Sequence, residues 1–302
     1  MVDAGAKPLV TITGVTGFIG SQVCLSFLDC GEFRVRGTVR DTKNEAKMAP
    51  LRRAFGEHFA KMEFVEADLL NAESIAQAVA GSTYVVHTAS PVDFRLPTDE
   101  IVKIAVEGTM AVMKACSASG VKRCVVTSSM AAVCAMAQTD KPNIDTGFYD
   151  ESCWSNPARP EGLMGYTKSK TLAEKAAWDY VQSLPEDQRF ELVTICPTMV
   201  LGPTLLSEHL SSGMMVLGYM NGSKTECSPG EMGVVDVRDV AKQHLEAVRR
   251  PDAANQRFIS YAERKRFIDI AQDLHDAFAS KGFSVCNKLK EGVAEKDARV
   301  NN

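Results

Sequence analysis

The sequence has few of the features that mark a membrane protein or a nucleic-acid-binding protein. It contains 34 Lys and Arg against 38 Asp and Glu, which gives a formal net charge of −4. A chain without excess positive charge has no electrostatic reason to bind nucleic acid or an anionic membrane surface. Its longest uncharged stretch, residues 8–28, includes three glycines and several hydroxyl side chains, and no basic cluster precedes it. We therefore expect neither a membrane span nor a signal peptide.

Paired cysteine motifs are also absent. The nine cysteines occur singly, no C-x-x-C pair is present, and their number is odd. Several lie within apolar strand or helix patterns, which is typical of small buried side chains in a reducing compartment. Disulfides and zinc sites are not indicated. We expect no metal site and a cytoplasmic location.

The sequence does contain a regular alternation of strand-like and helix-like segments over its first ~130 residues. The expected strands are residues 9–13, 33–40, 62–69, 83–89 and 123–129. The expected helices between them are residues 18–30, 44–58, 72–80 and 98–119, with Thr98 as the cap of the last. This alternation is typical of a parallel sheet covered on both faces. The predicted fold class is α/β, with a Rossmann-type doubly wound parallel sheet and a smaller C-terminal substrate lobe.

The second half of the chain predicts how the domains divide. A helix at 165–183 and a strand at 190–200 extend the alternation, which then loosens into helices at 207–219, 237–249 and 266–280. We assign residues 1–200 and 233–250 to the nucleotide-binding Rossmann domain. Residues 201–232 and 251–302 are assigned to a small substrate-binding lobe over the carboxyl edge of the sheet.

A glycine-rich loop lies between the first expected strand and the first expected helix. Backbone N–H groups at a helix N-terminus bind phosphate where no Cβ stands in the way. We expect Gly14 to permit the tight turn, Gly17 to let a pyrophosphate approach, and Gly20 to let the helix pack on the strand. This loop predicts dinucleotide binding; the alternative is a glycine-rich turn with no ligand. The expected contacts are Gly14, Thr16, Gly17, Phe18, Ile19 and Gly20.

The end of the second strand decides between NADP and NAD. NAD enzymes place a carboxylate there, whereas this chain has Val39 at that position, followed by Arg40. A guanidinium suits the 2′-phosphate of NADP, with Lys43 or Lys47 as assistants. The sequence therefore predicts NADP. The alternatives are a solvated Arg40, or a shift of one residue that brings Asp41 to the ribose.

Residues at the ends of the third and fourth strands are expected to complete the cofactor groove. Asp68 either hydrogen-bonds the adenine amino group or serves in a turn or helix cap. The other expected contacts are Leu69, Thr88, Ala89 and Ser90.

Tyr166 and Lys170 lie four residues apart, which places them on one face of a helix. A free phenol has a pKa of about 10, and a nearby ammonium favours the phenolate, which eases proton exchange near neutrality. The spacing alone is common by chance, and a partly buried tyrosine beside a solvated lysine is the alternative. Its position, ~150 residues after the glycine loop and in the helix after the fifth strand, makes the motif more specific.

A run of hydroxyl side chains, Thr127-Ser128-Ser129, ends the fifth strand. Ligands meet doubly wound sheets at the carboxyl ends of their strands. We expect Ser129 to hydrogen-bond a substrate carbonyl, with Ser128 as the alternative. Serines at a strand end can also be simple turn formers.

These features together resemble the extended short-chain dehydrogenase/reductase superfamily, and within it the dihydroflavonol reductase and cinnamoyl-CoA reductase group. The matching segments span nearly the whole chain, and the run of residues 150–155 is the most group-specific. They are Val39-Arg40-Asp41, Thr127-Ser128-Ser129, Asp150-Glu151-Ser152-Cys153-Trp154-Ser155, Tyr166-x-x-x-Lys170 with Thr171-Leu172-Ala173-Glu174, Pro197-Thr198, Gly202-Pro203 and Val235-Asp236-Val237-Arg238-Asp239-Val240-Ala241.

The resemblance implies reduction of an aldehyde or ketone to the alcohol by NADPH. It implies Ser129, Tyr166 and Lys170 as the catalytic triad, with Tyr166 as the proton donor and a small carbonyl compound as the partner. Cys134, five positions after Ser129, falls at a substrate-lining position at which flavonoid-reducing members have an amide.

The same resemblance assigns further cofactor contacts. It implies Arg40 and Lys47 at the 2′-phosphate, and Pro197 with Thr198 beside the nicotinamide. We expect Tyr166 and Lys170 to contact the cofactor as well, with Lys170 on the hydroxyls of the nicotinamide ribose. Ala105 stands where many relatives have asparagine in the long fourth helix.

Three other functions fit the same fold. A nucleotide-sugar epimerase or dehydratase would retain tightly bound NAD and usually has an acidic residue at the position of Val39. A 3-hydroxysteroid-type dehydrogenase is separable only by its substrate. Non-enzymatic NADP sensors can lose the triad, but Ser129, Tyr166 and Lys170 are all present. No feature of the sequence indicates an oligomeric state.

Overall fold

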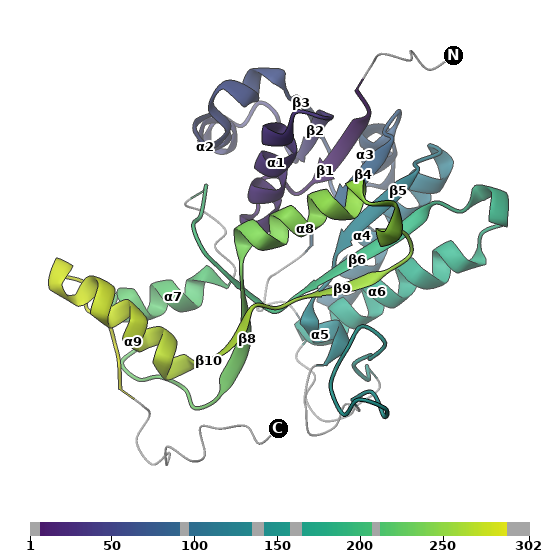
Figure 1. Ribbon diagram of the computed structural model, residues 1–302. Coiled ribbons are helices and arrows are strands. Elements are labelled where there is room, and N and C mark those ends of the chain that lie inside the picture. Colours follow the sequence, from purple (N-terminus) through teal and green to yellow (C-terminus); the bar gives the residue numbers. More distant parts are fainter. Residues whose placement is uncertain (1–6, 91–96, 135–141, 158–164, 207–211, 289–302) are drawn as a thin grey trace.

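The computed structural model describes residues 7–90, 97–134, 142–157, 165–206 and 212–288. Its main body is a seven-stranded parallel sheet in the order β3-β2-β1-β4-β5-β6-β9 (Figure 1). The first six of these strands have the order of a Rossmann sheet, so the predicted fold class is confirmed. The strands are β1 (Leu9–Thr13), β2 (Arg34–Val39), β3 (Glu63–Glu66), β4 (Tyr84–His87), β5 (Arg123–Thr127), β6 (Glu191–Pro197) and β9 (Arg257–Ser260).

Helices cover both faces of this sheet, and Figure 1 shows the two layers. Helices α1 and α8 pack together on one face, where α2 adds apolar side chains to the same core. Helices α3, α4 and α6 form the other layer, in which α4 packs along α6. The central strands β1 and β5 are buried at every position, because they have helices on both sides. The helices of the two layers are α1 (Phe18–Cys30), α2 (Glu45–Phe55), α3 (Ala72–Val79), α4 (Thr98–Ala118), α6 (Gly165–Ser183) and α8 (Val237–Arg249).

A second, three-stranded sheet in the order β10-β8-β7 forms the small lobe with two helices (Figure 1). Its strands are β7 (Met199–Leu201), β8 (Glu231–Asp236) and β10 (Glu263–Arg266), and its helices are α7 (Gly213–Met220) and α9 (Phe267–Phe278). A one-turn helix, α5 (Met130–Val133), follows β5 closely. Short 3₁₀ segments lie at Gly56–Lys61, Glu186–Gln188, Pro251–Ala253 and Ala279–Lys281.

Two predictions about local structure are wrong. The single strand predicted at 190–200 is two strands, β6 and β7, which belong to different sheets and are separated by Thr198. Thr198 pairs with Ser260 through its backbone N–H and its hydroxyl, so the chain turns from one sheet to the other there. Thr98 does not cap α4, because the carbonyl of Pro97 accepts from the N–H groups of Glu100 and Ile101 and the helix begins at Thr98 itself.

The sheet pairing also differs from the predicted domain boundaries. Strand β9 lies within the range 251–302 that we assigned to the small lobe, yet it pairs with β6 at the edge of the main sheet. Strand β7 pairs with β8 in the small sheet, although residues 199–200 were assigned to the Rossmann domain. The chain therefore contributes to both sheets in alternation after residue 190.

None of the described helices is both long and apolar enough to span a bilayer. Within the same residues, no three His, Cys, Asp or Glu side chains are grouped as ligands for a metal ion.

Candidate active site

The glycine loop joins β1 to α1 at the carboxyl edge of the sheet, next to the end of β4. Gly14 has φ of 77°, and a Cβ on it would lie 2.8 Å from the backbone nitrogen of Ala89. A Cβ on Gly20 would lie 2.1 Å from the carbonyl oxygen of Gly14 and 2.5 Å from Oγ1 of Thr88. Both glycines are therefore required by close backbone approach, as the sequence predicts for Gly20. Gly17 begins α1 and donates its N–H to the Gly14 carbonyl at 2.9 Å.

The N-terminus of α1 fits a dinucleotide phosphate. No side chain caps this helix, and its first turn carries no acidic residue. Its first N–H groups thus remain for an anionic ligand, beside a cradle that any side chain at Gly14 or Gly20 would fill. Thr16 and Ile19 are partly buried in this region. Phe18 is buried in a cluster with residues of the small sheet and α8, so only its backbone faces the loop.

The end of β4 is fastened to the end of β1. The Thr88 hydroxyl donates to the carbonyl of Thr13 at 2.6 Å, and the Ala89 N–H donates to the Thr13 hydroxyl at 3.2 Å. The same hydroxyl lies 2.8 Å from Nδ1 of His87. Burial, with a smaller effect of the charge on Lys170, lowers the pKa of His87 to about 3, so its ring is neutral. The expected contacts Thr88 and Ala89 thus lie beside the glycine loop, and Ser90 follows them in the chain.

The end of β2 presents Arg40 to solvent, while Val39 before it is buried. Asp41 is held in a turn, where its carboxylate accepts from the N–H of Lys43 at 2.8 Å. Lys47 lies in the first turn of α2. Arg40 and Asp41 are both exposed at the strand end, but the carboxylate of Asp41 is engaged in a local turn.

Asp68 and Leu69 follow β3. The Asp68 carboxylate accepts from the N–H of Leu70 at 2.8 Å, so the turn role that the sequence left open is present. Leu69 is partly buried, and it lies so close to Gly108 of α4 that a Cβ there would be 3.1 Å from Leu69 Cβ. Ala105, one turn earlier on α4, is also buried and has no polar group to offer.

Tyr166 and Lys170 lie on the first turns of α6, and they face the end of β5. The Tyr166 hydroxyl is 3.5 Å from Oγ of Ser129. Ser129 begins α5 as its N-cap, and its Oγ accepts from the N–H of Ala131 at 3.1 Å. The Lys170 ammonium is buried and donates to the carbonyl of Thr127 at 3.3 Å. The structure therefore brings Ser129, Tyr166 and Lys170 together.

The end of β5 is fixed from its other side by His244 of α8. The ring lies 2.7 Å from Val240 O through Nδ1 and 2.7 Å from Thr127 Oγ1 through Nε2. A carbonyl only accepts, so Nδ1 carries the proton and the Thr127 hydroxyl donates to Nε2. Burial lowers the pKa of His244 to about 4, which keeps this tautomer neutral. Thr127 is thus held through its side chain by α8 and through its carbonyl by Lys170.

Ser128 points to a different partner. Its hydroxyl donates to Oε2 of Glu174 at 2.5 Å, and its N–H donates to the carbonyl of Ile195 at 2.7 Å. Ser129, and not Ser128, is therefore the serine beside Tyr166. Sequence reasoning did not single out Glu174, although its spacing of four residues after Lys170 puts it on the same face of α6.

The remaining expected contacts lie around this centre. Pro197 is buried at the end of β6, and Thr198 follows it at the junction of the two sheets. Cys134 ends α5 and is partly buried, with its N–H donating to the carbonyl of Met130 at 2.9 Å.

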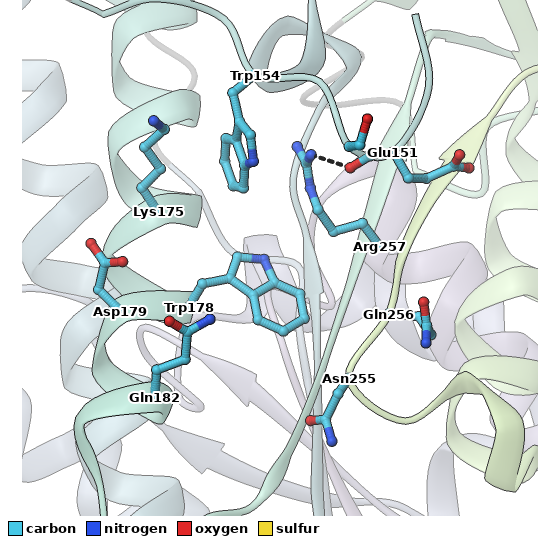
Figure 2. Close-up of a pocket in the computed structure, with 10 residues that line it drawn as sticks. Glu151, Trp154, Lys175, Trp178, Asp179, Gln182, Asn255, Gln256 and Arg257 are labelled. Atoms are coloured by element: carbon cyan, nitrogen blue, oxygen red, sulfur yellow. Dashed lines mark hydrogen bonds between the residues drawn. The ribbon is translucent and has the colours of Figure 1, made fainter. Parts of the chain in front are cut away.

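A hollow of about 600 Å³ lies elsewhere, on the outer side of α6. Figure 2 shows Trp154, Lys175 and Trp178 around it, with Arg257 reaching in from β9. Neither Ser129 nor Tyr166 is among its lining residues. This hollow is therefore not the candidate active site.

Comparison with known proteins identifies the family of the chain. The sequence profile of the 3-beta hydroxysteroid dehydrogenase/isomerase family matches residues 11–260. Tetraketide alpha-pyrone reductase 1 of Arabidopsis thaliana is 37% identical over 259 residues, which are 84% of this chain and 76% of that reductase. Dihydroflavonol 4-reductase of Hordeum vulgare is 32% identical over 278 residues, covering 91% of this chain and 76% of its own length.

A solved structure gives the same result. Yeast methylglyoxal/isovaleraldehyde reductase complexed with NADPH superimposes with a TM-score of 0.78 and 28% identity, covering 94% of this chain and 86% of the yeast chain. The resemblance drawn from the motifs, to extended short-chain reductases of the dihydroflavonol reductase group, is therefore confirmed.

Proposed function

The chain belongs to the 3-beta hydroxysteroid dehydrogenase/isomerase family, and from this we propose that it is an NADPH-dependent carbonyl reductase. It converts an aldehyde or ketone to the alcohol, with Tyr166 as the proton donor. The observation that carries the proposal is the Tyr166 hydroxyl at 3.5 Å from Ser129 Oγ, with the buried Lys170 one turn further along α6. The similar proteins from Arabidopsis thaliana and Hordeum vulgare are named as reductases, which agrees with this direction of reaction.

NADP is the proposed cofactor. The cradle at Gly14 and Gly20 and the uncapped start of α1 suit its pyrophosphate, and the exposed Arg40 suits its 2′-phosphate. An NAD enzyme would need a carboxylate where Val39 is buried. The similar yeast reductase is complexed with NADPH, which supports the same choice.

The proposed mechanism uses three side chains at the end of β5. Ser129 and Tyr166 donate hydrogen bonds to the substrate carbonyl oxygen, on which negative charge develops in the transition state. When bound, NADPH supplies the hydride. Tyr166 gives its proton to the forming alkoxide. Lys170, whose ammonium donates to the Thr127 carbonyl, supplies positive charge one turn of α6 beyond the tyrosine that gives up its proton.

The family name supports a second candidate, a dehydrogenase that acts on a 3-hydroxysteroid. It would use the same three side chains, so only the substrate separates it from the first. A 3-ketosteroid is therefore tested in the same experiment as the other carbonyl compounds.

The test is a binding and turnover comparison with the purified protein. We expect NADPH to bind at least about ten times more tightly than NADH, because only NADPH offers a phosphate to Arg40. NADPH oxidation is then followed with aliphatic and aromatic aldehydes, a dihydroflavonol, an α-pyrone ketone and a 3-ketosteroid. Purification with tightly retained NAD, or no NADPH oxidation with any carbonyl, would contradict the proposal; the first result indicates an epimerase or dehydratase and the second a sensor.

A further inference from the structure

Glu174 is a buried carboxylate for which the proposed chemistry has no use. It lies on α6, four residues after Lys170 and eight after Tyr166, so all three share one face of the helix. The residue is only 2% exposed. Burying a charge is unfavourable unless it is paired and hydrogen-bonded. Its partners therefore decide what it does.

The partners of Glu174 come from three strands and from its own helix. Its two oxygens accept from Ser128 at 2.5 Å, Thr194 at 2.8 Å, Trp178 at 3.3 Å and the guanidinium of Arg257 at 2.8 and 3.4 Å. Ser128 follows β5, Thr194 lies on β6 and Arg257 begins β9. The Glu174 carboxylate thus joins α6 to the end of β5, the middle of β6 and the start of β9.

The Arg257 side chain is the counter-ion, and it is 9% exposed. It also donates to the carbonyls of Glu151 at 2.5 Å and Cys153 at 2.8 Å, and its guanidinium lies 3.7 Å from the ring centroid of Trp154. Figure 2 shows this guanidinium beside Trp154, with its bond to Glu151. The carboxylate of Glu151 in turn accepts from the N–H of Ile259 at 3.0 Å. The segment around residues 150–154 therefore holds Arg257 in place, and Arg257 holds Glu174.

The consequence lies at Ser129. The bond from Ser128 to Glu174 fixes the residue that immediately precedes Ser129, and it fixes that residue to the helix that carries Tyr166. The distance between Ser129 Oγ and the Tyr166 hydroxyl depends on how the end of β5 sits against α6. Two charged side chains of α6 span these elements: Lys170 bonds to Thr127, and Glu174 bonds to Ser128, the residue next to Ser129.

From this geometry we infer that Glu174, with Arg257 as its counter-ion, is a positioning residue that holds Ser129 opposite Tyr166 through Ser128. This inference deepens the proposed reductase function and rests on it. Glu174 bonds to Ser128, the neighbour of Ser129 in the chain, so its effect on Ser129 passes through the backbone at residues 128–129. A displacement of about 1 Å at reacting groups lowers turnover strongly.

The test compares Ser128→Ala and Glu174→Gln with a matched control, Glu191→Gln. Glu191 forms an ion pair of 2.7 Å with the buried Arg123 on the same two strands, β5 and β6, but at their amino ends. Turnover is expressed per NADPH-binding site, so that loss of folded protein does not count. We expect a fall of about ten-fold or more in Ser128→Ala and Glu174→Gln, with NADPH affinity unchanged, and a change within about two-fold in Glu191→Gln.

The double variant Ser128→Ala/Glu174→Gln gives a second measurement. If both residues act through one link, the double variant is no slower than the slower single variant. A purely structural role for Glu174 would lower the melting temperature without lowering turnover per site. Multiplying effects of the two changes, or a loss in Glu191→Gln equal to that in Glu174→Gln, would overturn the inference.

A third measurement needs no turnover. The N–H of Ala131 donates to Ser129 Oγ, so its hydrogen exchange reports whether that hydroxyl stays in place. We expect exchange about ten-fold faster in Ser128→Ala than in the parent, and unchanged in Glu191→Gln. Unchanged exchange at Ala131 in Ser128→Ala would contradict the inference even if no carbonyl substrate is found. Conversely, full turnover in Tyr166→Phe would refute the proposed mechanism while leaving the link between Glu174 and Ser129 measurable by exchange.

Discussion

The ammonium of Lys170 lies 3.3 Å from the backbone carbonyl of Thr127, and the side chain that carries it is buried. Because this carbonyl belongs to β5, the hydrogen bond holds the ammonium of Lys170 beside the end of the strand and away from solvent. Tyr166, one helical turn earlier, therefore has its cation supplied by the same helix that orients it. The proton transfer that we propose for Tyr166 depends on this arrangement, and it leads to the first prediction.

Tyr166→Phe is expected to lower kcat by about 10²- to 10⁴-fold, because the phenylalanine has no proton to give to the alkoxide. NADPH affinity should change little, since the hydroxyl is not needed to hold the phosphates. Stopped-flow NADPH oxidation and fluorescence titration measure the two quantities. Tyr180→Phe, the same change later on α6, serves as the control and should keep the parent kcat. Turnover near that of the parent in Tyr166→Phe would rule out the proton-donor role.

Arg40→Ala should weaken NADPH binding by about 10- to 100-fold, which corresponds to the loss of charge-assisted hydrogen bonds to the 2′-phosphate. The affinity for NADH, which has no such phosphate, should stay within about two-fold. Isothermal titration with both cofactors gives the comparison. Arg53→Ala on the exposed face of α2 is the matched control. Equal losses for NADPH and NADH would show that Arg40 acts on something other than the phosphate.

Gly20→Ala should destabilise the fold and prevent NADPH binding. Its Cβ would meet the Gly14 carbonyl at 2.1 Å and the Thr88 hydroxyl at 2.5 Å, and the carbonyl is backbone that cannot move aside without opening the loop. Overpacking of this kind costs about 1–3 kcal/mol or more. Gly218→Ala is the control, because the nearest atoms to a Cβ in that helix belong to the flexible side chain of Lys224, at 3.3 Å and beyond. Thermal unfolding with and without NADPH tests both variants, and normal binding by Gly20→Ala would disprove the cradle.

The pH dependence of stability should carry a contribution from buried neutral histidines. Burial lowers the pKa of His244 to about 4, so below its ordinary value of 6.5 the unfolded chain binds a proton that the folded chain does not. Stability is therefore complete above about pH 7 and is lost as the pH falls; for His244 the loss between pH 7 and pH 5 is about 2 kcal/mol. His87, with its pKa lowered to about 3, acts in the same direction.

His244→Gln tests this contribution, because an amide can donate to the Val240 carbonyl and accept from Thr127 without titrating. Urea unfolding at the two pH values should show a smaller difference in the free energy of unfolding for the variant than for the parent, by about 2 kcal/mol. If parent and variant lose the same amount of stability on acidification, His244 is not the group responsible.

Much of the main sheet could be predicted because its strands are buried on both faces and appear as short apolar runs. Helix α1 and its glycine stop, Gly31 with φ of 67°, fall where the sequence places them. The edge strand β9 of the main sheet and the strands of the small sheet could not be predicted from apolar runs in this way. Strand β10 reads Glu-Arg-Lys-Arg and has no apolar alternation, while β7 is too short to be separated from β6 by sequence pattern. Their pairing depends on partners that are distant in the chain.

The candidate site likewise has a part that could be predicted from the sequence and a part that could not. Tyr166 and Lys170 share a helix, so their spacing alone predicts that they lie together. The environment of Glu174 depends on Thr194 and Arg257, which lie 20 and 83 residues further along the chain. No local sequence pattern predicts contacts between residues that are so far apart in the chain. The hydrogen bond between His244 and Thr127 likewise joins residues that lie 117 positions apart in the chain.

The two sheets are joined by unusually short connections. Only Thr198 separates β6 from β7, no residue separates β8 from α8, and Tyr261 with Ala262 joins β9 to β10. Two of these links join the sheets directly and the third joins the small sheet to α8 of the main body, so the lobe is tied to the main body at three points. For the proposed reductase, we expect selection among carbonyl compounds to depend on the side chains around Ser129 and Tyr166. We therefore expect that a new substrate range requires substitution of the side chains around the site. The lobe cannot be exchanged as a separate module without cutting through the main sheet.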